Sequence, residues 1–169
     1  MNFTKKQIPL QPAPGLALQQ FGVRCLLMKI DSFQRFLDAQ GPIYAEVLAE
    51  LSAGKKLSHW MWFIFPQHVA LGTSDRAKRF GLYGLEQARE YFEHPVLGKR
   101  LLECCCLVLR HSKVSIERIF GDLDAKKFHS SISLFALAVP NEQIFKKVLD
   151  IIYQGALDLR TVTIVNKPF

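Results

Sequence analysis

Side chains able to do acid–base or stacking chemistry gather in residues 58–67, which contain both tryptophans of the chain. His59 could act as a general acid or base, with its pKa tuned by burial beside Trp60. If this stretch is extended, Trp60 and Trp62 lie on one side of it, where two indoles could stack a nucleobase, a nicotinamide or a sugar ring. Gln67 could bind a ligand amide or cap a helix. The structural alternative is a hydrogen-bonded histidine and two tryptophans that pack in the core.

A second set of polar residues lies near the start of an expected helix and comprises Asp124, Lys127, Ser130 and Ser131. At helical spacing Asp124 faces Lys127, and Lys127 faces the two serines. A lysine that deprotonates a serine is a known way to make a nucleophile. The same lysine and hydroxyls would also suit a phosphate clamp, because they offer hydrogen-bond donors to an anion. The structural alternative is an exposed ion pair beside a hydroxyl on the helix surface.

Further polar residues stand near expected helix starts, where backbone N–H groups favour an anion; they are Ser74, His94 and Arg100. Arg100 could extend the phosphate clamp, whereas His94, which precedes a proline, has a turn cap as its alternative. We therefore hypothesise one concave site in which His59, Asp124 and Lys127 do the chemistry. The remaining members would bind the ligand, namely Trp60, Trp62, Gln67, Ser74, His94, Arg100, Ser130 and Ser131.

The charge of the chain limits its partners. The 169 residues are 49% hydrophobic and 22% charged, which suits one compact domain and is too apolar for a disordered chain. The net charge is +7, but residues 1–30 supply four basic side chains and no acid, and removing those four from 22 leaves 18 basic against 15 acidic residues. The body of the chain therefore does not demand a polyanion, and we expect a small anionic ligand rather than nucleic acid.

The cysteines and the apolar runs argue against a metal site and a membrane span. Cys25 and residues 104–106 form no Cys-x-x-Cys pair, and no histidine stands at metal-ligand spacing. We expect reduced, partly buried thiols in a cytoplasmic protein without metal or cofactor. The alternative is one redox-sensitive thiol on the exposed side of its helix. No apolar run approaches the ~20 residues needed to span a bilayer.

Apolar stripes at helical spacing dominate the rest of the chain and predict a mainly α fold of about six to eight helices. The clearest stripes are Tyr44-Val47-Leu48-Leu51, Leu97-Leu101-Cys104-Cys105-Val108, Phe128-Ile132-Phe135 and Phe145-Val148-Leu149-Ile152. The aromatic run between Gly54 and Pro66 is the one short extended segment that we expect. We predict a poorly ordered extension over residues 1–30 and a single helical domain over residues 31–165. Its core should contain Leu101, Phe120, Phe135, Val148 and Leu149.

Six short motifs follow one another along the chain. They are Asp31-x-Phe33-x-Arg35-Phe36-x-x-Ala39-Gln40, Gly54-x-Lys56-x-Ser58-His59-Trp60-Met61-Trp62-Phe63-Ile64-Phe65-Pro66-Gln67, Leu71-Gly72-x-Ser74, His94-Pro95-x-Leu97-Gly98-x-Arg100-Leu101, Phe120-Gly121-x-x-Asp124-x-x-Lys127-x-x-Ser130-Ser131 and Gly155-x-x-Asp158-x-x-Thr161. This set resembles a family of uncharacterised bacterial and plant proteins, a domain of unknown function whose members are often labelled calpastatin. The chain departs from the family pattern at Ala70-Leu71-Gly72, where Gly-Leu-Gly is usual.

The resemblance implies a mostly helical single domain and supplies no reaction. The label calpastatin implies nothing here, because true calpastatin inhibitory segments are disordered. A looser similarity to mainly helical glycosidases that act on ADP-ribose-type N-glycosides carries over no catalytic residue.

Two hypotheses of function remain open. The first is an enzyme or sensor for a nucleotide-like or sugar-phosphate molecule, with its ring near Trp60 and Trp62 and its phosphate near Lys127, Ser130 and Arg100. As an enzyme it would cleave an N-glycosidic or a phosphoester bond. The second hypothesis is a non-catalytic interaction or structural domain, with the tryptophan-rich run entirely in the core.

Overall fold

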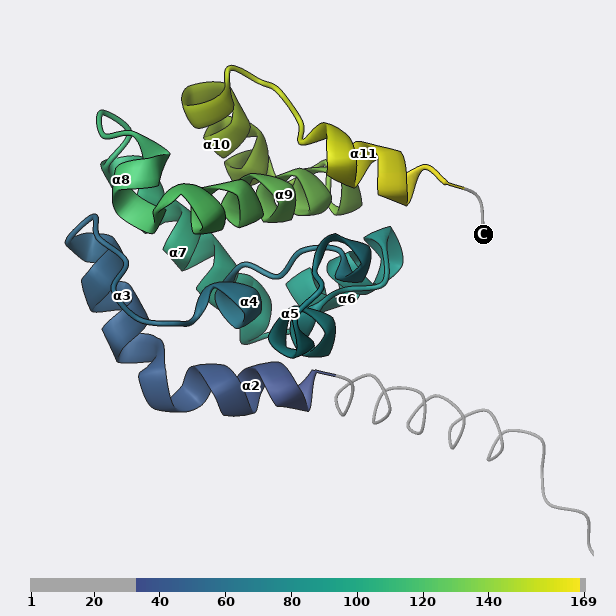
Figure 1. Ribbon diagram of the computed structural model, residues 1–169, viewed down its shortest axis with the longest axis horizontal. Coiled ribbons are helices and arrows are strands. Elements are labelled where there is room, and N and C mark those ends of the chain that lie inside the picture. The colour runs from purple at the N-terminus through teal and green to yellow at the C-terminus, as the bar shows by residue number, and fades with distance from the viewer. Residues whose placement is uncertain (1–32, 168–169) are drawn as a thin grey trace, which may run out of the picture. The chain divides into compact units, whose positions relative to one another are not determined.

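Helices form almost all of the regular structure. The computed structural model describes residues 33–167, and within them the regular backbone is helical apart from an isolated bridge between His68 and Leu82 (Figure 1). The α-helices are α2 (Gln34–Gln40), α3 (Tyr44–Ser52), α4 (Met61–Ile64), α5 (Asp75–Phe80), α6 (Leu85–Glu93), α7 (Leu97–Arg110), α8 (Ile116–Phe120), α9 (Asp122–Ala138), α10 (Gln143–Tyr153) and α11 (Leu159–Val165). Two short 3-10 helices, η1 (Gly41–Ile43) and η2 (Val69–Leu71), complete the set. The mainly α class predicted from the sequence is confirmed.

Helix α9 is the central element of the fold. Figure 1 shows it with α10 and α11 on one side and α4 and α6 on the other, and all four helices contact it. The helix buries Phe128, Ile132, Leu134 and Phe135, and also the hydroxyls of residues 130, 131 and 133. Because these serines are small and polar, they give neighbouring backbone segments fixed hydrogen-bond partners inside the core. Helix α9 therefore organises both the core and the polar site described below.

Aromatic rings fill much of the space between the helices. The ring of Phe128 lies 4.8 Å from that of Phe65 and 4.9 Å from that of Phe120, measured between centroids. The core predicted from the sequence is confirmed: Leu101, Phe120, Phe135, Val148 and Leu149 are all at most 6% exposed. Each such side chain stabilises the fold by about 1.5–3 kcal/mol through burial.

The aromatic run is not extended, contrary to our expectation. Met61–Ile64 form the short helix α4, and Trp60 stands at its N-cap. Helical residues two apart do not face the same way, so Trp60 and Trp62 do not share a side. Trp60 is fully buried, whereas Trp62 is partly exposed. The run misled the prediction because a short, wholly apolar segment carries no period that separates strand from helix.

The described residues, 33–167, pack as one compact domain. The extension predicted over residues 1–30 lies outside the described residues. Among residues 33–167 no helix combines the length and the apolar character that a membrane crossing requires.

Candidate functional site

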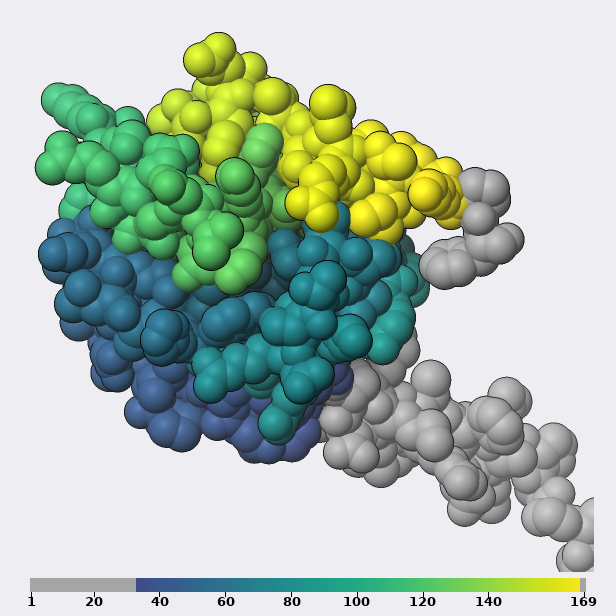
Figure 2. Space-filling model, in the orientation of Figure 1, coloured from purple at the N-terminus to yellow at the C-terminus, as the bar shows by residue number. Residues whose placement is uncertain are grey.

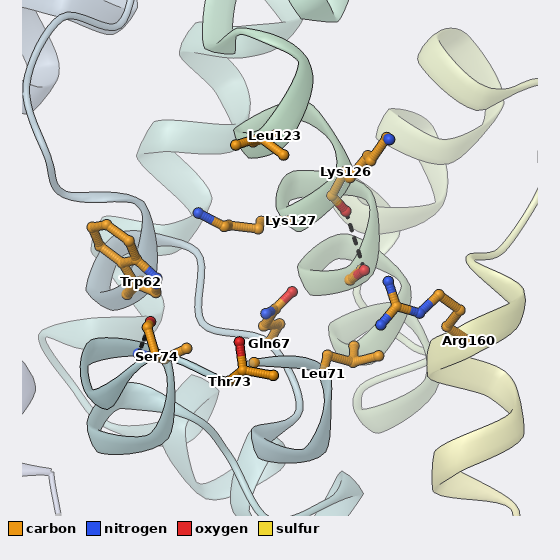
Figure 3. Close-up of a pocket in the computed structure, with 12 residues that line it drawn as sticks. Trp62, Gln67, Leu71, Thr73, Ser74, Leu123, Lys126, Lys127 and Arg160 are labelled. Atoms are coloured by element: carbon orange, nitrogen blue, oxygen red, sulfur yellow. Dashed lines mark hydrogen bonds between the residues drawn. The ribbon is translucent and has the colours of Figure 1, made fainter.

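A pocket of about 240 Å³ lies between residues 67–77 and the helices α9 and α11 (Figure 3). Its lining residues are Trp62, Gln67, Leu71, Gly72, Thr73, Ser74, Ala77, Leu123, Lys126, Lys127, Ser130 and Arg160. The pocket brings together five members of the hypothesised site, which are Trp62, Gln67, Ser74, Lys127 and Ser130. The space-filling view places this region where the α4–α5 segment meets the C-terminal helix (Figure 2).

Cationic side chains line the pocket, and no carboxylate does. The cations are Lys126, Lys127 and Arg160. Figure 3 shows Lys127 reaching from α9 towards Trp62, and Arg160 reaching from α11 towards α9. Within residues 33–167 the side chains of Lys126 and Arg160 form no ion pair or hydrogen bond. The Arg160 charge is therefore available to a ligand in the pocket, whereas the Lys126 ammonium points away from Trp62 and Gln67 in Figure 3 and reaches such a ligand by rotation of its side chain.

Lys127 is held in place from two sides. Its Nζ donates to Asp124 Oδ1 at 2.7 Å and lies 4.5 Å from the centroid of the Trp62 ring. The guanidinium of Arg76 lies 5.5 Å from the same centroid. The indole thus already interacts with two cations, each of which the negative face of the ring attracts. In this arrangement Trp62 positions Lys127 at the wall of the pocket.

Asp124 stands behind the wall and does not line the pocket itself. Its Oδ2 pairs with Lys56 Nζ at 2.7 Å, while Oδ1 pairs with Lys127 at the same distance. Burial raises the pKa of the Asp124 carboxyl, but hydrogen bonds from Lys127 and Lys56 lower it by more, so the pKa lies below its ordinary value. A carboxylate committed to two lysines is a weak base. Asp124 therefore holds Lys127 in position and does not itself line the pocket, and its catalytic role stays a prediction.

Ser130 ties α11 to α9 and so sets the position of Arg160. Its Oγ lies 2.8 Å from Asp158 Oδ2, and Asp158 caps α11 by accepting from the Thr161 backbone N–H at 3.1 Å and hydroxyl at 2.6 Å. The Asp158 N–H donates to Ser133 Oγ at 2.8 Å. Burial raises the pKa of Asp158, but the bonds from Thr161 and Ser130 lower it by more. The first turn of α11 is thus anchored to α9 through the charged carboxylate of Asp158.

Short backbone segments form the opposite wall. Ser131 lies behind the pocket, where its Oγ donates to the carbonyl of Pro66 at 2.7 Å and fixes the chain that leads into the wall. Ser74 caps α5, because its Oγ accepts from the Ala77 N–H at 3.2 Å. Gly72 packs so tightly here that a Cβ on it would lie 2.2 Å from that of Ala77. The wall therefore depends on a residue without a side chain.

Comparison with known proteins places the chain in a family. A family model described as "Protein of unknown function (DUF1810)" matches residues 30–165. The chain belongs to the DUF1810 family. It is also similar to a solved crystal structure, that of the conserved hypothetical protein Rv1873 from Mycobacterium tuberculosis, with 45% sequence identity and a TM-score of 0.76. That similarity covers 80% of this chain and 97% of the other. No curated protein matches.

This membership confirms that the chain belongs to a family of unknown function, and the DUF1810 description names no ligand or reaction. The chemistry of the site therefore has to come from its geometry. Among residues 33–167, no group of three or more His, Cys, Asp or Glu side chains could hold a metal ion. Within that same range, the pocket is the place where the predicted polar residues and unpaired cations of this DUF1810 chain coincide.

His59 and Trp60 do not line the pocket, contrary to the hypothesis of one site. His59 is exposed and makes no hydrogen bond within residues 33–167, so the burial beside Trp60 that we expected is absent. Trp60 is fully buried and its Nε1 donates to Glu50 Oε2 at 2.8 Å. Neither residue belongs to the lining of the pocket.

His94 and Arg100 also serve the fold rather than the pocket. His94 Nδ1 accepts from the N–H groups of Val96 and Leu97 at 3.2 and 3.4 Å, which is the turn cap we gave as its alternative. Arg100 donates to Gln40 Oε1 at 3.1 Å and lies over the ring of Tyr44. Both residues hold the start of α7 against its neighbours, so they do not extend the anion clamp.

Sequence reasoning missed two of the three cations. Lys126 directly precedes the predicted Lys127. It was not predicted because the site was built only from residues three or four positions apart on the helix. Arg160 comes from the last described helix, which no apolar stripe marked. The available signal was the motif Gly155-x-x-Asp158-x-x-Thr161, because an aspartate three residues before a threonine can cap a helix that starts between them. That cap is what brings Arg160 to the pocket.

Proposed function

We propose that this protein binds a small organic phosphate in the pocket between residues 67–77, α9 and α11. The observation that carries the proposal is the donor set without a lining carboxylate: two lysines, one arginine, one amide and the hydroxyls of Thr73 and Ser74, since the Ser130 hydroxyl is bonded to Asp158. A phosphate group offers three strong acceptor oxygens to such donors. Charge-assisted bonds of this kind are roughly twice as strong as neutral ones, and the arginine fork can bind two phosphate oxygens at once.

The charge balance of the site favours a dianion. The charged groups that line the pocket or hold its walls are Lys56, Arg76, Asp124, Lys126, Lys127, Asp158 and Arg160, with a net charge of +3 from five cations and two carboxylates. A phosphate monoester carries about −1.5 to −2 near neutral pH. Lys126 and Arg160 can engage it without breaking an ion pair, because neither has a partner within residues 33–167.

The geometry supports binding better than hydrolysis. The lining contains no histidine, cysteine or carboxylate to act as acid, base or nucleophile. The Ser130 hydroxyl is committed to Asp158, so the idea that Lys127 activates Ser130 has no hydrogen bond behind it. We therefore propose a receptor or sensor site, and we assign no N-glycosidic or phosphoester cleavage to it.

The ligand that fits is compact and is recognised mainly through its phosphate. Trp60 is buried, and Trp62 already interacts with two cations, so a nucleobase would gain little by stacking there. The volume of about 240 Å³ lies below the ~300–1,000 Å³ of sites for drug-sized ligands. The alternative function, an interaction domain with the whole tryptophan run in the core, agrees with Trp60 and not with Trp62.

Removing the charge of Lys126 or of Arg160 should weaken phosphate binding about 10- to 100-fold, because a hydrogen bond between charged groups contributes about 1.5–3 kcal/mol. The variants Lys126→Met and Arg160→Met keep an apolar stem of similar length. Calorimetric titration with inorganic phosphate and with ribose 5-phosphate measures the change. Both variants should melt at the temperature of the unaltered protein, since neither side chain has a partner in the described fold.

The matched control is Lys99→Met, which removes an exposed lysine on α7 away from the pocket. It should leave binding unchanged. A second readout is tryptophan fluorescence, whose response to the ligand should disappear in Trp62→Phe. Equal weakening by Lys99→Met, or no binding of either phosphate by the unaltered protein, would contradict the proposed function.

A further inference from the structure

A second hollow adjoins the phosphate pocket. It has a volume of about 310 Å³ and is lined by Leu71, Leu159, Arg160, Thr163 and Ile164. Leu71 of η2 and Arg160 of α11 line both spaces, so the two hollows are neighbours along one groove. Apart from Arg160 and one threonine, the lining of this second hollow is aliphatic. We call it the apolar groove.

The apolar groove follows from the spacing of residues on α11. Positions four apart are neighbours on the same side of a helix, so Leu159 lies next to Thr163, and Arg160 lies next to Ile164. The Asp158 cap fixes where this face points, because it anchors the first turn of α11 to α9. The Arg160 guanidinium turns towards α9 in Figure 3. Its methylene stem is left beside the groove, as is usual for long cationic side chains on apolar surfaces.

The rims of the two hollows are unusually apolar for a phosphate site. Leu159 is 79% exposed and borders the apolar groove, and Leu123 is 75% exposed and borders the phosphate pocket. No other large hydrophobic side chain among residues 33–167 is as exposed as these two. One exposed leucine is ordinary, but two that flank a joined pair of hollows favour a ligand-binding groove. Removing such surface from water is favourable by ~25 cal/mol per Å².

We propose that the ligand is an amphiphilic phosphate monoester, with its phosphate in the cationic pocket and an aliphatic arm in the apolar groove. This inference rests on the proposed function and adds the chemical class of the body that carries the phosphate. The phosphate is assigned to the pocket because the pocket presents unpaired cations to it. The aliphatic arm is assigned to the apolar groove because Arg160 lines both hollows, so the groove begins where the phosphate is bound. A sugar in the same place would set its hydroxyls against Leu71, Leu159 and Ile164, which offer them no hydrogen bond.

The test is a series of alkyl phosphates titrated against the full chain by calorimetry. Methyl, butyl and hexyl phosphate share one head and differ only in the arm, and ribose 5-phosphate serves as the polar comparison. Affinity should rise up to about fourfold per methylene, the equivalent of ~0.8 kcal/mol for each buried CH₂, until the groove is filled. Hexyl phosphate should bind more tightly than ribose 5-phosphate.

Variants locate the gain in the groove. Leu159→Ser and Ile164→Ser should flatten the chain-length series while methyl phosphate still binds with the affinity of the unaltered protein. Leu57→Ser is the matched control, because Leu57 is 70% exposed and lines neither hollow; it should leave the series unchanged.

The outcomes separate this inference from the proposed function. If methyl phosphate binds but affinity does not depend on chain length, or if ribose 5-phosphate binds more tightly than hexyl phosphate, the aliphatic arm is wrong and the phosphate site stands. If Leu57→Ser flattens the series as much as Leu159→Ser, the gain comes from non-specific adsorption, and the groove is again wrong. If no phosphate binds at all, both proposals fail.

Discussion

Gly98→Ala should destabilise the protein by about 3 kcal/mol or more, although alanine is the better helix former by about 1 kcal/mol. Gly98 lies in the first turn of α7 and is buried against the end of α6. A Cβ at this position would lie 1.9 Å from the carbonyl oxygen of Phe92 and 2.9 Å from the carbonyl carbon. These are backbone atoms, so no side-chain rotation can relieve the contact. The two helices would have to separate, and the core around Leu97 and Leu101 would open.

The control for this prediction is Gly41→Ala. Gly41 stands at the C-cap of α2 with φ −47°, ψ −56°, and a Cβ on it would have no atom within 4 Å. Alanine there should leave the free energy of unfolding unchanged or raise it by about 0.4–1 kcal/mol, because it restricts the unfolded chain. Urea denaturation followed by circular dichroism measures both variants. Similar stability of the two variants would show that α6 and α7 can separate freely, against the contact described.

Gly98 also explains one motif of the family resemblance. From the motif His94-Pro95-x-Leu97-Gly98-x-Arg100-Leu101 we offered Arg100 as an extension of the anion clamp, and His94 as a ligand-binding residue or a turn cap. In the structure His94 caps the turn, Gly98 permits the close approach of two helices, and Arg100 bonds to Gln40. The whole motif is therefore a helix junction. A pattern of polar residues in a sequence does not distinguish a junction from a ligand site, since both need satisfied hydrogen-bond donors.

The fold could be predicted because its helices are amphipathic. In α7 and α10 the apolar positions repeat at three- and four-residue intervals, so they form one face of the helix, and this face is buried by packing. Leu101, Val148 and Leu149 were placed in the core on this basis, and they are buried. Helix α9 is buried on nearly all sides along its second half, yet its phenylalanines keep the period. Periodicity could not predict whether residues 61–64 form a helix or an extended segment, because a run without polar residues has no hydrophobic period.

The site could be predicted only in part because its residues meet through contacts that are distant in sequence. Lys127 and Ser130 were found from helical spacing, which is a local property. Arg160 reaches the pocket through the bond between Ser130 and Asp158, whose residues are 28 positions apart. His59 was placed in the site because we expected it to be buried beside Trp60, and in the structure it is exposed. Local patterns thus identified the α9 half of the pocket and missed the α11 half.

Glu50→Ala should cost about 3 kcal/mol or more of stability, although sequence patterns gave this residue no role. Glu50 is 8% exposed and its carboxylate accepts the N–H of Leu57 at 2.8 Å, the N–H of Ser58 at 2.9 Å and the Trp60 indole N–H at 2.8 Å. It closes the loop between α3 and α4. Alanine would leave these partly or fully buried donors without an acceptor, and each buried donor left unsatisfied costs about 1–3 kcal/mol.

Glu46→Ala is the control, because Glu46 lies one helical turn earlier on α3 and is exposed. It should change the free energy of unfolding by less than about 0.5 kcal/mol. Glu50→Gln keeps one acceptor oxygen and should fall between the two. If Glu50→Ala proves no more harmful than Glu46→Ala in urea denaturation, the loop does not depend on this carboxylate.

The same carboxylate should make stability depend on pH. Burial raises the pKa of Glu50, but the hydrogen bonds from Leu57, Ser58 and Trp60 lower it by more, so the folded pKa lies below its ordinary value. A group with a depressed folded pKa stabilises the fold fully above its unfolded pKa, which is about 4.3 for glutamate, and loses that contribution as pH falls through the folded pKa. The stability difference between the unaltered protein and Glu50→Gln should therefore be constant near neutral pH and shrink below about pH 4. A difference that stays constant down to pH 2 would mean that the charge of Glu50 contributes nothing and that only its shape matters.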